Sequence, residues 1–293
     1  MAEFLEALRN PDISFFRYAF IIGMLASVAF GIIGTYVVAR RITYIAGAIS
    51  HCVLGGIGAG LYLQKKIGII WFDPMYGAVL AALLAAVIIG MVSLYASQRE
   101  DTVIGALWAT GMAIGLLFLA KTPGYVEPMS YLFGNILLIS KNDLWIVLGL
   151  DGLVVGLAGL FYNKFLAICF DEEFARLRGI RTEFYYMLLL CLTSLTVVLL
   201  VRIVGIVMVI AMLTLPAAVA GNFSRGLWQM MGLAILFCMF FVATGLGFSY
   251  TRNLPSGPTI IVIAGITYLA ALTVKQLAIR KPRQLRDKGN PGL

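Results

Sequence analysis

The sequence predicts an all-α fold, a polytopic integral membrane bundle of about eight to ten transmembrane helices (about nine is the best count) plus one short re-entrant helix. Composition is the first reason, because 61% of the 293 residues are hydrophobic and only 12% are charged. An ordinary soluble domain is about 45–50% apolar and about 25% charged, so a soluble enzyme is excluded. Length is the second reason, since crossings of about 20 residues use the whole chain. We expect residues 1–293 to form a single transmembrane domain.

Apolar segments with the length of membrane spans follow one another along the chain. We expect spans over residues 17–39, 44–63, 76–96, 103–120, 144–162, 183–203, 205–221, 227–249 and 257–277. The second span contains Gly55, Gly56, Gly58 and Gly60. Small residues at these positions let helix backbones pack closely in lipid, so we expect this helix to contact its neighbours tightly.

Two places depart from the simple pattern of spans. The apolar stretch from Met129 to Ile139 is too short to cross the membrane and follows Pro128, so we expect a re-entrant helix. Gly205 separates two adjoining spans, and Pro216 interrupts the second of them. A broken helix is tolerated where neighbouring protein satisfies the freed carbonyl groups. The break marks either a transport pathway or a packing kink.

The C-terminal end of the chain sets the expected orientation. Residues 278–293 contain five basic residues and one acid: Arg280, Lys281, Arg283, Arg286, Lys288 and Asp287. Because basic segments stay on the cytoplasmic side, we expect a basic cytoplasmic tail at 278–293. An odd number of spans then places the N-terminus outside. The net charge of +8 fits basic loops beside anionic membrane lipids, and nucleic acid is not an expected partner.

The longest expected inside loop contains a short helix pattern at about 170–179. Its residues are Phe170, Asp171, Glu172, Glu173, Phe174, Ala175, Arg176, Leu177, Arg178 and Gly179. The acids fall in the first turn and the bases in the last, which matches the helix dipole, and the glycine is placed to end the helix. The apolar residues recur at helical spacing. The segment is either a docking surface for another subunit or a helix that lies on the membrane.

Two ionisable residues within the spans are candidates for a functional role. His51 is the only histidine, and a lone histidine in a helix is usually a packing residue. Asp151 lies in the middle of the fifth span, where a carboxylate must pair or be protonated. Arg202 is a possible partner that would make Asp151 purely structural. Burying such groups in a membrane is expensive, so both residues remain functional candidates.

Several short motifs, in order along the chain, resemble those of the membrane permease subunits of ATP-binding-cassette importers for zinc, manganese and iron. They are VARRITY at 38–44, AISHCVLGG at 48–56, DTVIG at 101–105, YLFGNIL at 131–137, DEEFARLRG at 171–179, VGIVMV at 204–209, LPAAVA at 215–220 and LPSGPT at 254–259. The resemblance covers nearly the whole chain.

The resemblance implies a homodimeric channel in a bacterial plasma (inner) membrane. Two separate ATPase subunits would supply energy, and an extracytoplasmic metal-binding protein would deliver the substrate. The sequence contains no phosphate-binding loop of the type GxxxxGK[ST], so we expect this chain to be no enzyme. The transported divalent metal would be the substrate, and we expect the chain to bind no cofactor.

The resemblance also assigns roles to particular residues. Segment 171–179 would couple the spans to the ATPase, and His51 would belong to the metal pathway. Many family members have an Asp one helical turn before this histidine, where this chain has Gly47. A carboxylate and an imidazole four residues apart share one helix face and can both hold a cation. Asp151 is then the candidate to replace the missing acid.

Other functions stay open at this point. The same machinery could carry a metal chelate or another small nutrient. A secondary carrier or channel without ATPase subunits is opposed by the scarcity of titratable groups in the spans. A membrane enzyme is opposed by the lack of an HExxH motif and of a second histidine. The metal itself is undecided, since imidazole suits zinc and iron whereas carboxylates suit manganese.

Overall fold

A computed structural model describes residues 14–95, 100–124, 128–134 and 141–287. In these ranges it contains nine helices that are long and apolar enough to cross a membrane. They are α2 (Ser14–Ala39), α3 (Thr43–Tyr62), α4 (Pro74–Tyr95), α5 (Glu100–Lys121), α7 (Lys141–Leu160), α10 (Thr182–Val204), α11 (Ile206–Phe223), α12 (Leu227–Arg252) and α13 (Ser256–Asp287). Each coincides with an expected span, so the predicted helical bundle is confirmed.

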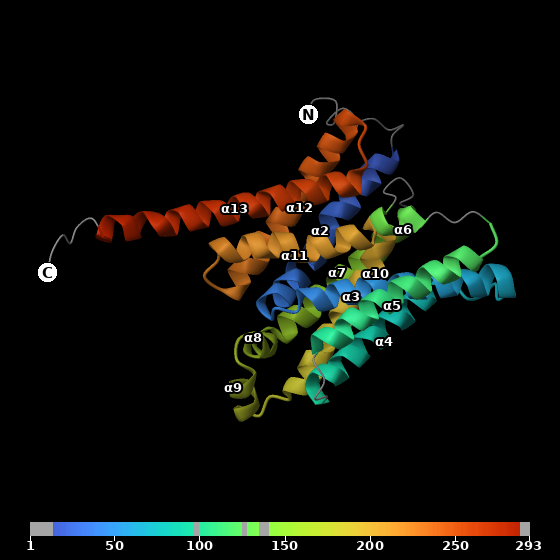
Figure 1. Cartoon of the computed structure of the whole chain (residues 1–293), viewed down its shortest axis with the longest axis horizontal. Coiled ribbons are helices and arrows are strands. Elements are labelled where there is room, and N and C mark those ends of the chain that lie inside the picture. The colour runs from blue at the N-terminus through green and yellow to red at the C-terminus, as the bar shows by residue number, and fades with distance from the viewer. Residues whose placement is uncertain (1–13, 96–99, 125–127, 135–140, 288–293) are drawn as a thin grey trace.

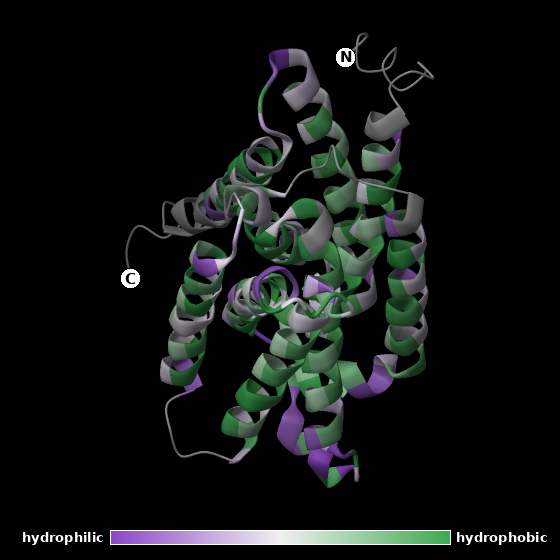
Figure 2. Cartoon of the chain, turned by 90° about the vertical axis from the view of Figure 1, so that its right-hand side faces the viewer, coloured by the Kyte–Doolittle hydropathy of each residue, from purple (hydrophilic) through white to green (hydrophobic). Residues whose placement is uncertain are grey.

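Hydrophobic residues run along the length of these helices, and hydrophilic residues gather mainly near their ends (Figure 2). Helix α13 extends furthest from the bundle, because it continues through the first part of the expected basic tail (Figure 1). Residues 288–293 of that tail and the expected external N-terminal segment lie outside the described residues. The pattern is that of a multi-pass membrane protein, with apolar side chains facing lipid as well as the core.

Helix α3 is the centre of one half of the bundle and packs mainly against α4 and α5 (Figure 1). Glycines make this packing close: a Cβ atom on Gly58 would lie 2.6 Å from the Gly115 carbonyl oxygen, and one on Gly55 would lie 2.9 Å from that of Gly111. A Cβ on Gly56 would overlap the backbone of Gly77. The expected role of the α3 glycines in helix packing is confirmed.

The other half of the bundle is built on α2, which packs against α7, α11 and α12. Helix α11 contains Pro216, which has no N–H to donate to the Met212 carbonyl one turn earlier. The buried Cys238 thiol of α12 donates to this carbonyl at 3.7 Å. Helix α11 is continuous through Pro216, so the expected interruption there does not occur, and a neighbouring helix satisfies the carbonyl that the proline frees.

Four shorter elements connect the spans: a π-helical turn, η1 (Leu63–Ile67), and helices α6 (Pro128–Phe133), α8 (Tyr162–Phe170) and α9 (Glu172–Leu177). Helix α6 is the described part of the expected re-entrant segment, whose residues 135–140 lie outside the description. Gly134, with a φ of 72°, ends α6 against the break between α10 and α11 at Gly205, whose φ is 83°. A Cβ on either glycine would overlap the other segment's backbone.

The same region also receives the start of α13. A Cβ on Gly257 would lie 2.6 Å from the Phe133 carbonyl oxygen. Three of the motifs named above, at 131–137, 204–209 and 254–259, therefore meet at one point in the fold. Only glycine permits so close an approach of three backbones, which gives these motifs a structural reason.

The loops that we expect on the cytoplasmic side lie at one end of the bundle. Arg40, after α2, forms an ion pair with Glu172 of α9. The Tyr95 hydroxyl at the end of α4 donates to Glu183 in the first turn of α10 at 2.9 Å. The Tyr162 ring of α8 contacts the Trp228 ring of α12 at a centroid distance of 5.9 Å. These loops therefore lie at the same end of the bundle, as expected if successive spans cross the membrane in alternating directions.

Candidate functional site

His51 lies on the almost wholly buried helix α3 and is 9% exposed. Its imidazole stacks on the indole of Trp108 from α5, with ring centroids 4.8 Å apart and planes inclined by 28°. Its Nδ1 atom is buried and has no hydrogen-bond partner within the described part of the chain. A buried nitrogen of this kind is costly unless it is satisfied by another ligand. The geometry therefore leaves the Nδ1 atom of His51 available to act as a ligand atom in this part of the bundle.

Gly47 lies one helical turn before His51, and the structure shows what occupies the space beside it. A Cβ atom built on Gly47 would overlap Cζ3 and Cη2 of the Trp108 indole. Trp108 therefore fills the volume that a side chain at position 47 would need. Sequence reasoning noted the missing acid but did not identify Trp108, because nothing in the sequence indicates which helix faces Gly47.

Asp151, the proposed replacement ligand, is 7% exposed on α7. Its Oδ1 atom accepts a hydrogen bond from the Ala29 backbone N–H of α2 at 3.1 Å, and its Oδ2 atom has no partner among the described residues. His51, by contrast, lies against α5. The described contacts thus do not bring Asp151 and His51 together, and the side chain of Arg202 is outside the description.

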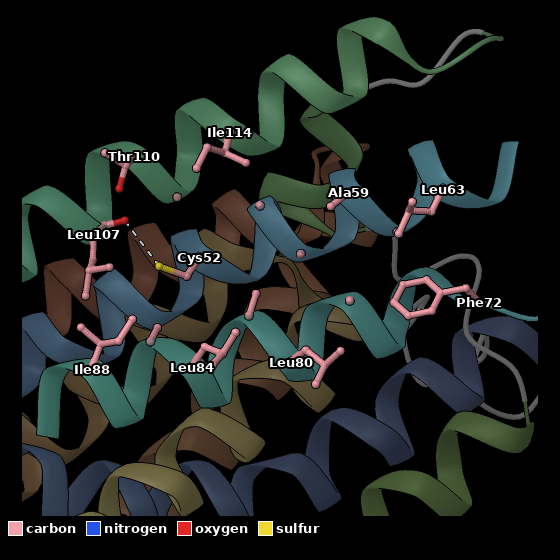
Figure 3. Close-up of a pocket in the computed structure, with 17 residues that line it drawn as sticks. Cys52, Ala59, Leu63, Phe72, Leu80, Leu84, Ile88, Leu107, Thr110 and Ile114 are labelled. Carbon is pink, nitrogen blue, oxygen red and sulfur yellow. Dashed lines mark hydrogen bonds between the residues drawn. The ribbon is translucent and has the colours of Figure 1, made fainter. Parts of the chain in front are cut away.

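No group of three or more His, Cys, Asp or Glu side chains that could hold a metal ion occurs in the described ranges. A cavity of about 420 Å³ opens between α4 and α5 over α3, next to the His51 level (Figure 3). Its lining is apolar apart from Cys52 and Thr110, and the Cys52 thiol donates to the Leu107 carbonyl at 3.4 Å. This cavity offers surface for apolar chains rather than a ligand set for a cation.

The expected coupling segment lies at the end of the bundle that also holds Arg40. The structure differs from a single helix over 170–179: Phe170 ends α8, Asp171 is extended, and α9 runs only from Glu172 to Leu177. The Asp171 carboxylate caps α9 by accepting from the Phe174 N–H at 2.9 Å. Gly179 adopts a φ of 76° and ends the segment.

The apolar side chains of this segment are open to the outside. Leu177 is 88% exposed, Phe170 69% and Phe174 49%, while Ala175 faces the protein and is fully buried. The Arg178 guanidinium lies 4.8 Å from the centroid of the Phe174 ring. A short helix with an exposed apolar stripe and charged neighbours is typical of a docking surface.

Arg40 ties this segment to the spans. Its guanidinium donates to the Ile168 carbonyl of α8 and to the Glu172 carboxylate of α9, and it lies 5.1 Å from the centroid of the Tyr186 ring of α10. Glu172 also pairs with Arg176 at 3.5 Å, as its spacing predicts. Burial raises the pKa of the neighbouring Cys169 thiol to about 12, and Arg40 opposes that rise. Sequence reasoning missed Arg40, although it lies in the motif at 38–44.

A cavity of about 490 Å³ lies beside α9. Its lining includes the cationic side chains of Lys164, Arg178 and Arg181. The Lys164 ammonium donates to the Tyr185 hydroxyl at 2.7 Å and also lies over that ring. The exposed apolar stripe of Phe170, Phe174 and Leu177 is thus bordered by a positively charged hollow, a pattern that suits an acidic surface.

Comparison with known proteins relates this arrangement to membrane transport. A probable metal transport system membrane protein of Chlamydia pneumoniae is 40% identical over 258 residues, which are 88% of each chain. The manganese transport system membrane protein MntC of Listeria monocytogenes is 32% identical over 268 residues, or 92% of each chain. The solved structure of PsaBC from Streptococcus pneumoniae in complex with Fab matches with a TM-score of 0.80 at 29% identity and covers 92% of this chain and 94% of that chain.

The fold defines a multi-pass helical membrane protein with a short helix, exposed on its apolar side, at one end, which fits the class of a transporter's membrane subunit. The model of the ABC 3 transport family matches residues 12–275. The chain belongs to the ABC 3 transport family. The resemblance to metal-importer permeases that the sequence motifs indicated is thereby confirmed.

Proposed function

We propose that this chain is the membrane-spanning permease of an ATP-binding-cassette importer that moves a divalent transition metal into the cell. Separate ATPase subunits hydrolyse ATP and dock on the surface formed by α8 and α9. An extracytoplasmic metal-binding protein delivers the metal on the opposite side. Two copies of the chain form the channel in a bacterial plasma membrane, with the C-terminus in the cytoplasm and the N-terminus outside.

The observation that carries this proposal is the exposed apolar stripe of the coupling segment, held to the spans by Arg40. Leu177 and Phe174 lie outside the helices that are long enough to span a membrane, yet their apolar side chains are exposed. The ion pair of Arg40 with Glu172 and its contact with Tyr186 connect this stripe to α2 and α10. Such a rigid link is what a partner needs in order to move the spans by pushing on α9.

The homodimer is supported by the surface that the single chain leaves uncovered. Helix α5, which carries Trp108, leaves most of its residues exposed, including Leu116 and Leu117. An import pathway between two copies would cover such a face and bring the two His51 residues into one channel. A metal chelate as the cargo is the second candidate, favoured by the small number of cation ligands in the described part of the spans.

Retention of the ATPase by the purified permease tests the docking surface. Leu177→Asp places a charge in the exposed stripe and should abolish co-purification of the ATPase, because a charge at a desolvated apolar contact is costly. Ile70→Asp is the matched control, since Ile70 is 84% exposed in the loop between η1 and α4 at the opposite end. Equal retention of the ATPase by both variants would contradict the assignment of α9 as the coupling helix.

A further inference from the structure

We propose that Trp108 fills the space that a second metal ligand at position 47 would need, and that it positions the His51 ring. The metal pathway at His51 would then favour imidazole-binding ions such as zinc over manganese. This inference rests on the proposed function and adds a selectivity to it. Trp108 acts through His51 and through the space it fills, so it is a positioning residue.

The first step is geometric. Gly47 and His51 lie four residues apart on α3 and therefore share one face of the helix. The Trp108 indole reaches both positions, since its ring stacks on the imidazole and its Cζ3–Cη2 edge occupies the Cβ position of residue 47. A carboxylate at position 47 and the indole in its present place exclude each other. One side chain from α5 thus prevents the pairing of an acid with His51.

The second step concerns the imidazole itself. Stacked aromatic rings hold each other in a preferred orientation, with a gain of about 0.5–1.5 kcal/mol. The contact with Trp108 therefore fixes the plane of the His51 ring, while its buried Nδ1 remains without a partner among the described residues. A nitrogen donor held in one orientation binds a cation at a lower entropic cost than a free side chain does.

The third step is the chemistry of the ligand set. Carboxylate oxygens suit manganese, whereas imidazole suits zinc and iron, and the affinity of a given site rises from manganese through iron toward zinc. A site with one imidazole per chain and an indole in place of the carboxylate lacks the ligand type that manganese prefers. Asp151 does not supply it, because its described hydrogen bond is to the α2 backbone. The passage should therefore discriminate against manganese.

The test compares the binding of Zn²⁺ and Mn²⁺ to the permease–ATPase complex in lipid nanodiscs by titration calorimetry. The His51→Leu variant gives the background from other sites. Wild type should show a His51-dependent site for Zn²⁺ and weak binding of Mn²⁺. The double variant Gly47→Asp with Trp108→Ala opens the space and adds the acid, and should lower the Kd for Mn²⁺ relative to that for Zn²⁺ about tenfold, equal to about 1.4 kcal/mol.

Two further variants separate positioning from mere packing. Trp108→Phe keeps a ring on His51 and should preserve the Zn²⁺ affinity within about twofold, whereas Trp108→Ala should weaken it about tenfold with little effect on the Mn²⁺ to Zn²⁺ ratio. Trp145→Ala is the control for loss of an indole, because Trp145 is 69% exposed on α7. It should leave both affinities unchanged.

Several results would overturn the inference. Tight His51-dependent binding of Mn²⁺ by the wild type is one, and an unchanged affinity ratio in the double variant is another. A single Gly47→Asp variant with the ratio of the double variant would show that Trp108 does not close the site. Uptake assays with the full transporter keep the two proposals apart: absence of any metal uptake by the wild type contradicts the proposed function, whereas uptake with an unaltered Zn²⁺ to Mn²⁺ ratio in all variants contradicts this inference alone.

Discussion

At the scale of single residues, two substitutions of His51 separate the effect of its imidazole nitrogens from the effect of its side-chain volume. His51→Leu keeps the bulk of the side chain and removes the nitrogen donor, and His51→Ala removes both. If the metal passes His51, both variants should lose uptake, and Leu should be at least as damaging as Ala. Radiometal uptake by cells that express the whole transporter measures this order. A packing histidine gives the reverse order, with Leu tolerated and Ala destabilising through a cavity.

Gly47 is the second residue whose role can be isolated. Gly47→Ala forces the new Cβ into the Trp108 indole and should destabilise the protein by about 1–3 kcal/mol, the usual cost of overpacking. Thermal unfolding in detergent measures the loss, and adding Trp108→Leu should restore most of it. Gly105→Ala is the matched control, because a Cβ there meets nothing within 4 Å. Equal stability of Gly47→Ala and Gly105→Ala would contradict the close contact.

Much of this residue-scale picture could not be derived from the sequence. The motif that contains His51 and the absence of an acid at Gly47 were visible, because each depends on positions along one helix. The contact with Trp108 depends on which face α5 turns toward α3. The close contacts between the glycines of the two helices determine this orientation. Asp151 was identified as a buried carboxylate, but its hydrogen bond to Ala29 requires knowledge of the neighbouring helix.

At the scale of secondary-structure elements, the carbonyl that Pro216 frees within α11 is satisfied by a contact from α12. Cys238→Ala removes the donor to the Met212 carbonyl and should cost about 1–3 kcal/mol, the penalty for an unsatisfied buried group. Cys238→Ser keeps a hydroxyl donor and should lose less. Thermal unfolding of the two variants measures the two losses of stability. Identical losses would mean that the thiol contributes only its volume.

The attachment of α9 through Arg40 gives a second prediction at this scale. Arg40→Ala and Glu172→Ala should each loosen the coupling segment, and the double variant should lose less than the sum, with a coupling energy of about 1.5–3 kcal/mol. Arg40→Lys should not restore the wild type, because the guanidinium donates to Ile168 and Glu172 from two different nitrogens. Unfolding free energies of the four proteins complete the cycle, and strict additivity would contradict the link.

The elements themselves were predictable to a large extent. The nine spans follow from apolar runs of membrane length, and the end of the α9 segment follows from Gly179 in its sequence. The extended conformation of Asp171, which separates Phe170 from Phe174, was not predicted. A capping carboxylate needs this backbone geometry, so α9 is shorter than the apolar spacing of the segment indicated.

At the scale of the whole molecule, the two ends of the bundle are held together by different kinds of contact. One end joins α6, the α10–α11 break and the start of α13 through glycines, and the other joins α2, α8, α9 and α10 through Arg40. A partner that moves α9 therefore acts on α2 and α10, which run from one end to the other. In the proposed importer, this arrangement would connect ATP hydrolysis by the partner subunits to a metal pathway at His51.

ATP-dependent metal uptake by the reconstituted transporter tests this account most directly. The permease, its ATPase and the metal-binding protein are assembled in proteoliposomes, and Zn²⁺ accumulation is followed with and without ATP. The account predicts accumulation that requires ATP and the ATPase, and that is lost in Leu177→Asp, while the His51-dependent binding of Zn²⁺ to that variant persists. Accumulation by the permease alone, driven by an ion gradient and indifferent to ATP, would contradict it.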